Sequence, residues 1–192
     1  VLTQSRDEHV SRQPSAAPIV KPIGGAQVLY PVDGDAGGTW MALSNAGRAV
    51  SLMNGAFETH ERFPPYRRSR GLVVLDFFEY ASVAHFANSY NFEGIEPFTM
   101  VVVEAEGPVV HELRWDANRV HLAAIDAVQP HIWSSAPLYT HTMRNERDAW
   151  FDHWMNHEGS TAAAVLDFQS KNIILKNSRK SLSETSHLKS LK

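Results

Sequence analysis

The chain has 192 residues, a mass of 21.5 kDa, a formal charge of −3, 43% hydrophobic residues and 20% charged residues. These values are typical of a folded protein of about one domain and exclude fibrous and disordered classes. Mild acidity argues against general nucleic-acid binding. No apolar run reaches the roughly 20 residues of a membrane helix, and the polar start VLTQSRDEH predicts no signal peptide. We therefore expect a cytoplasmic protein. The absence of cysteine excludes disulfides, thiolate metal sites and a cysteine nucleophile within the printed chain.

The first third of the chain predicts short strands separated by loops. Residues 1–4 read as the end of a strand, and the Pro- and Gly-containing residues 5–25 as a long connection with little regular structure. The turn Asn45-Ala46-Gly47-Arg48 joins two apolar runs, because Gly47 suits a position with positive φ. The strands predicted here are 27–32, 39–44 and 49–54.

The rest of the chain alternates between helical and extended patterns. Apolar residues at spacings of three and four predict helices, and partial alternation predicts half-buried antiparallel strands. Ser160 is expected to cap the last short helix. The helices are predicted at 66–80, 81–90, 138–155 and 160–168, and the strands at 98–106, 109–115, 119–125, 131–135 and 172–175. This order predicts an α+β fold with mostly antiparallel sheets.

Residues 176–192 form a basic polar C-terminal segment with five basic residues and one acidic residue, Glu184. A frayed final hairpin and a basic tail are both compatible with it. A solvated end is the commoner explanation of such a charge run.

Motifs for metal, phosphate and nucleophile sites are weak. Gly34–Gly38 lacks the Lys-Ser/Thr ending of a phosphate-binding loop. His153 and His157, four residues apart on a predicted helix, are able to present two ligands on one face, but two exposed histidines near a helix C-terminus are the commoner case. Ser134-Ser135 ends a predicted strand without the GxSxG pattern of a nucleophile elbow. We assign no metal ligand and no cofactor.

Aromatic and basic residues offer a second kind of site. The five tryptophans are expected mostly in the core. Arg67, Arg68 and Arg70 open a predicted helix, where an anionic ligand would meet both the helix dipole and the guanidinium groups. A solvated basic turn is the alternative.

Several ordered motifs resemble the NRDE family, which includes the transport and Golgi organisation protein 2 group. The motifs are Ser5-Arg6-Asp7-Glu8, Gly37-Gly38-Thr39-Trp40, Asn45-x-Gly47-Arg48 and Leu52-Met53-Asn54-Gly55. Further stretches are similar to its bacterial branch, namely Pro65-Tyr66-Arg67-x-Ser69-Arg70-Gly71, Gly94-Ile95-Glu96-Pro97-Phe98, Glu112-Leu113-Arg114-Trp115-Asp116 and Pro130-His131-Ile132-Trp133-Ser134-Ser135-Ala136. The likeness covers residues 1–175, which we take as one domain with an incomplete first strand.

The resemblance implies the four-layer αββα sandwich of N-terminal-nucleophile hydrolases, with two stacked antiparallel sheets. In that fold the first residue of the mature chain supplies the nucleophile and its α-amine takes the proton. Family members place a Cys there. The printed chain is expected to start inside the first strand without that Cys, so Val1 offers no nucleophile and we expect no catalysis by the chain as printed.

The supporting residues carry over one at a time. Arg6 and Asp7 match residues that lower the thiol pKa and hold the α-amine in related hydrolases, although a structural salt bridge is equally compatible. Asn54 matches an oxyanion donor. Ser135 stands where other branches show Asn as a second donor, and Ser5 replaces the family's Asn.

Three hypotheses follow. The natural protein is a hydrolase of non-peptide amides, or it binds and traffics an amphipathic ligand such as haem or an acyl lipid, or it is a decayed paralogue. The first implies a small-molecule substrate. The second would use Arg67, Arg68 and Arg70. No membrane-spanning segment and no nucleic-acid partner are expected in any of the three.

Overall fold

The computed structural model describes residues 1–6, 13–105, 109–158 and 161–170. The chain divides into a larger unit, Glu8–Ala149, and a smaller unit made of Val1–Asp7 and Trp150–Lys192. The predicted strand at 172–175 and the predicted cap Ser160 lie outside the described residues. Among the described helices, none combines the length and the hydropathy needed to cross a membrane.

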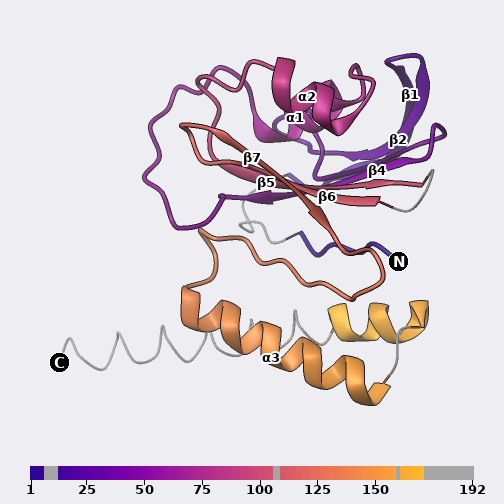
Figure 1. Cartoon of the computed structure of the whole chain (residues 1–192). Helices are drawn as coiled ribbons and strands as arrows, with labels where there is room; N and C mark the ends of the chain where they lie inside the picture. Colours follow the sequence, from indigo (N-terminus) through magenta and orange to yellow (C-terminus); the bar gives the residue numbers. More distant parts are fainter. Residues whose placement is uncertain (7–12, 106–108, 159–160, 171–192) are drawn as a thin grey trace. The chain divides into compact units, whose positions relative to one another are not determined.

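The larger unit is built on a seven-stranded antiparallel sheet (Figure 1). Each strand pairs with the next one in the chain, so the sheet is a meander with two helices inserted between the fourth and fifth strands. The strands are β1 (Ala16–Ile23), β2 (Ala26–Val32), β3 (Met41–Ser44), β4 (Arg48–Asn54), β5 (Phe98–Glu104), β6 (Val109–Trp115) and β7 (Val120–Ile125). The α+β class with antiparallel pairing is confirmed. The described residues form this single sheet, and the four-layer sandwich stays a prediction.

Two predictions for the N-terminal region are wrong. Residues 1–4 form no strand, and the expected connection over 5–25 contains β1, which pairs with β2 across a turn at Gly24 and Gly25. Pro18 and Pro22 suggested a loop because proline removes a ladder hydrogen bond. Among the described strands β1 lies at the edge of the sheet, and an edge strand tolerates that loss on its outer side.

The predicted strand at 131–135 is also wrong, because this segment joins no ladder. Its polar groups are bonded through side chains instead. The His131 ring donates to the Asp126 carbonyl at 2.7 Å, and Ser134 Oγ accepts from Arg147 Nε at 2.8 Å. These side-chain hydrogen bonds stand in place of the strand-to-strand hydrogen bonds that a strand at 131–135 would form.

Serine caps define where the two inserted helices begin. Ser69 Oγ accepts the amide hydrogen of Leu72, and Ser82 Oγ accepts that of His85. The first predicted helix is therefore shorter than 66–80. The described helices are α1 (Arg70–Phe77), α2 (Val83–Ser89), α3 (His141–Glu158) and an unlabelled helical segment at 162–170.

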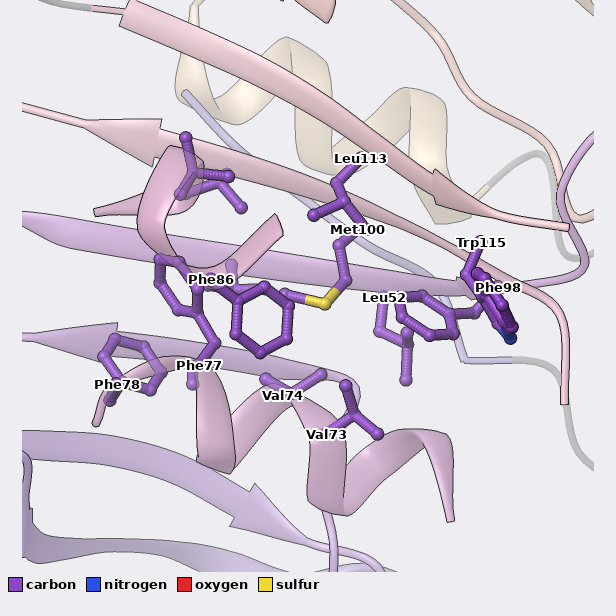
Figure 2. Packing of buried hydrophobic residues seen from close by; sticks show 14 of the residues in the cluster. Leu52, Val73, Val74, Phe77, Phe78, Phe86, Phe98, Met100, Leu113 and Trp115 are labelled. Atoms are coloured by element: carbon purple, nitrogen blue, oxygen red, sulfur yellow. The ribbon is translucent and has the colours of Figure 1, made fainter. Parts of the chain in front are cut away.

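The core lies between one face of the sheet and the helices α1 and α2, as Figure 2 shows. Alternate residues of β5 and β6 share this face, because Met100 pairs with Leu113 and Phe98 with Trp115. Phe77 and Phe86 bring the two helices together at 5.5 Å between ring centroids. The expected core role of Trp115 is confirmed, and its indole nitrogen donates to the Ile95 carbonyl at 2.9 Å.

The smaller unit has its own aromatic cluster. Trp150 and Trp154 of α3 pack on Phe168, with ring centroids 4.6 Å and 4.7 Å from it. Ser5 Oγ donates to Gln169 Oε1 at 2.7 Å. Ser5, the residue that departs from the family tetrad, therefore fixes the described N-terminal residues to the 162–170 helix.

The glycine motif before β3 makes a close backbone crossing. The Thr39 amide donates to the Gly71 carbonyl at 3.0 Å. A Cβ added at Gly38 would lie 2.7 Å from the Leu72 nitrogen, whereas one added at Gly37 (φ 67°) would meet nothing within 4 Å. Gly38 is required for the approach of two backbones, and Gly37 only for its positive φ.

Gly38→Ala is expected to lower the free energy of unfolding by about 3 kcal/mol, because the backbone of α1 has to shift to admit the methyl group. Gly37→Ala is the matched control and should cost about 1 kcal/mol for its left-handed conformation alone. Urea denaturation of both variants measures the difference. Equal losses would contradict the close crossing.

Candidate functional site

The candidate site lies where β4 ends. Asn54 is the last residue of β4 and pairs with Phe98 of β5. The chain then turns at Gly55, whose φ is 78°. A Cβ there would collide with the ring of Pro137, so only glycine fits.

Four successive carbonyls of the turn are each held by one side chain. This turn, residues 54–57, is called the clamped loop below. The donors are Ser135 Oγ to Asn54 at 3.0 Å, Thr99 Oγ1 to Gly55 at 2.9 Å, Arg114 Nη1 to Ala56 at 2.7 Å and Arg144 Nη1 to Phe57 at 2.5 Å. The Gly55 amide also donates to the Pro97 carbonyl at 2.9 Å. Five hydrogen bonds thus fix the backbone beside Asn54.

The side chain of Asn54 is half-buried, and no described residue forms a hydrogen bond with its carboxamide. The backbone of Asn54 is fixed, while its side-chain NH₂ group is available to donate to an acceptor on a bound ligand. Ser135, the other predicted donor, lies beside Asn54. Its hydroxyl hydrogen, however, is used on the Asn54 carbonyl, so the contact shown is one that positions Asn54.

An ion pair on the sheet supports the clamped loop. Arg114 binds Glu112 through two bonds of 2.7 Å and 2.8 Å, and the Trp133 indole donates to the same carboxylate at 2.7 Å. Burial acts to raise the pKa of Glu112, but the hydrogen bonds and charge of Arg114, with the Trp133 bond, hold it below its ordinary value. The ionised carboxylate keeps the guanidinium aimed at Ala56.

A second ion cluster lies next to Pro97. Glu96 is 7% exposed and accepts from His60, Arg62 and Arg70 at 3.1–3.2 Å. Arg70 also donates to the Pro97 carbonyl at 3.2 Å. In the sequence, this segment is identified as the family motif Gly94-Ile95-Glu96-Pro97-Phe98. The motif does not predict that the Glu96 carboxylate is buried. The cluster therefore holds the segment at Pro97, whose carbonyl accepts the hydrogen bond from the Gly55 amide.

The sequence model of the Transport and Golgi organisation 2 family matches residues 1–190. The chain belongs to this family. No protein in the search of curated proteins matches it.

Two motif residues expected from the Transport and Golgi organisation 2 resemblance lie in the smaller unit. Arg6 is half-buried and has an interaction partner. Asp7 lies outside the described residues. The roles of both residues stay predictions.

The basic residues near α1 are directed to separate internal partners. Arg67 Nε donates to the Glu93 carbonyl at 3.0 Å, and its Nη2 donates to that of Asn91. Arg68 forms a two-bond ion pair with Asp76, which also accepts from the Tyr90 hydroxyl. Arg70 binds Glu96. This arrangement favours a structural role for the basic run, and the anionic ligand stays a prediction.

A further hydrogen-bonded group lies at the end of β6. Asp116 accepts from His121 Nε2 at 2.7 Å and from the amides of Asn118 and Arg119 at 2.8 Å. The His121 ring packs edge-on against Phe57, with centroids 4.8 Å apart. Burial acts to raise the pKa of Asp116, but the His121 bond and the two amide bonds lower it to about 2.

Among the described residues, no group of three or more His, Asp or Glu could hold a metal ion.

Arg114→Met is expected to lower the free energy of unfolding by about 3 kcal/mol, because it leaves a half-buried Glu112 charge unpaired. The exposed Arg119→Met should stay within about 0.5 kcal/mol of the parent. Adding Glu112→Gln to Arg114→Met should restore part of the loss. Urea denaturation of the parent and the three variants measures these differences. Equal stability of Arg114→Met and the double variant would argue against the Arg114–Glu112 ion pair.

The Asp116 group predicts a dependence of stability on pH. A lowered pKa in the folded state means that the ionised carboxylate stabilises the fold above its ordinary value of 3.8, and that this contribution disappears as the pH falls through about 2. The stability difference between the parent and Asp116→Asn should shrink as the pH falls from about 4 to about 2. Urea denaturation across this range measures it. A difference independent of pH would contradict the pKa shift.

Proposed function

We propose that this protein contributes the oxyanion-stabilising part of an amide hydrolase of the N-terminal-nucleophile type. The substrate is a small molecule with a non-peptide C–N bond. The observation that carries the proposal is the clamped loop, which fixes the backbone of Asn54 while its carboxamide has no hydrogen-bond partner among the described residues.

When a nucleophile attacks an amide, negative charge develops on the carbonyl oxygen. A donor that is already in place stabilises this charge without reorganising during the reaction. The N–H group of the Asn54 carboxamide is suited to that task, because the loop behind it is held at each carbonyl. Loss of one such donor costs about 10²–10³ in rate.

The nucleophile is assigned by the family resemblance. It is a Cys at the start of the mature protein whose α-amine acts as the base. The printed sequence contains no Cys, so this part of the proposal requires the natural protein for its test. Arg6 and Asp7 would serve the thiol and the amine.

The alternative function, binding haem or an acyl lipid through Arg67, Arg68 and Arg70, has less support. All three guanidinium groups have partners within the protein. A ligand anion would have to compete with those partners.

The first measurement is the intact mass of the natural protein, purified from its source. We expect a mature chain that begins with Cys. A mature chain whose first residue is not Cys, Ser or Thr would overturn the hydrolase proposal, because no free α-amine would then adjoin a nucleophile.

With that protein, Asn54→Ala should reduce kcat for hydrolysis of N-acyl amide substrates by about 10²–10³ and change KM little. Asn88→Ala, which removes an exposed amide from α2, is the matched control and should keep full activity. Thermal unfolding confirms that both variants fold. Equal kcat values for the two folded variants would rule out the oxyanion role.

A further inference from the structure

We propose that His153 and His157 of α3 form a two-imidazole binding site for a divalent transition-metal ion such as Zn²⁺ or Cu²⁺. This inference is independent of the proposed hydrolase function. It concerns only the C-terminal half of α3, which belongs to the smaller unit.

The two rings already lie side by side on one face of the helix. Their centroids are 4.2 Å apart, with an angle of 29° between the ring planes. Residues four apart on a helix are neighbours on its surface, and neutral imidazole is the commonest metal ligand in proteins. A single ion between the two rings would be bound by one nitrogen of each.

A hydrogen bond selects the ligand atom of His157. Its Nδ1 lies 2.7 Å from the His153 carbonyl oxygen, which can only accept, so Nδ1 carries the hydrogen. In a neutral ring, Nε2 then holds the free electron pair. Metal-binding histidines commonly donate their other ring nitrogen to a carbonyl in this way, which fixes both tautomer and ring orientation.

The location also suits a cation. Both histidines are exposed and lie in the last two turns of α3, near its C-terminus at Glu158. The helix dipole places partial negative charge at this end. A site with two imidazole ligands leaves coordination positions open to water or other small ligands. Such a site exchanges its ion readily, unlike a closed structural zinc site.

The bound ion would join two successive turns of α3. A ligand that binds the folded helix and not the unfolded one raises the stability of the helix by linkage. Imidazole ligands and the usual order of affinities predict tighter binding of Cu²⁺ than of Zn²⁺. Mg²⁺, which prefers oxygen ligands, should not bind here.

Isothermal titration of the full chain with ZnCl₂, and separately with MgCl₂, tests the site. We expect one Zn²⁺ per chain that His153→Ala and His157→Ala each weaken at least about tenfold, and no Mg²⁺ binding. His85→Ala removes an exposed histidine of α2 and should leave the affinity unchanged. Zn²⁺ binding that survives the double variant His153→Ala/His157→Ala with the same affinity would overturn the proposal.

Electron paramagnetic resonance of the Cu²⁺-loaded chain gives a second readout. Two coordinated imidazole nitrogens are expected in the parent protein and one in either single variant. Because both side chains are exposed, circular dichroism should show equal helix content in all variants. A parent spectrum with oxygen ligands alone would contradict the two-histidine site.

Discussion

The clamped loop depends on side chains that are distant in the sequence. Its four donors stand 44 to 87 residues from the carbonyls they hold. After β4 ends at Asn54, the chain turns at the positive-φ Gly55 and leaves the ladder. Buried carbonyls without partners cost free energy. Thr99 and Arg114 supply the partners from β5 and β6, which are the strands next to β4 and next but one. The loop conformation therefore depends on the pairing of β4 with β5 and of β5 with β6.

This dependence explains the importance of the ion pair beneath the loop. Arg114 can reach the Ala56 carbonyl only if its charge is balanced, since an unpaired guanidinium is costly where water is scarce. Glu112 balances this charge, and the Trp133 indole donates a hydrogen bond to the Glu112 carboxylate. Residue 133 lies in the segment that was predicted as a strand. It contributes to the site because it is free of a ladder and its indole reaches the carboxylate.

Local patterns predicted most of the sheet and failed where tertiary partners decided. The β3–β4 hairpin and strands β5 to β7 follow from alternation and turn chemistry, both of which act within a few residues. Strand β1 was missed because its prolines indicate a loop unless the strand is known to lie at an edge, and edge position is a property of the whole sheet. The same limit applies to the site. The family resemblance predicts Asn54 and Ser135 as site residues, whereas Thr99 and Arg144 belong to no local motif.

The basic run near α1 shows why charge in a sequence does not define a binding site. Consecutive arginines suggest a patch, but their long side chains diverge in the structure, and each stabilises a different piece of backbone or carboxylate. A guanidinium with five donors is most stable where several acceptors converge, and irregular loops supply such acceptors in their carbonyls. The clamped loop uses arginine in the same way, through Arg114 and Arg144. Among the described residues, Arg67, Arg114 and Arg144 all donate to carbonyl oxygens of irregular backbone beside the sheet.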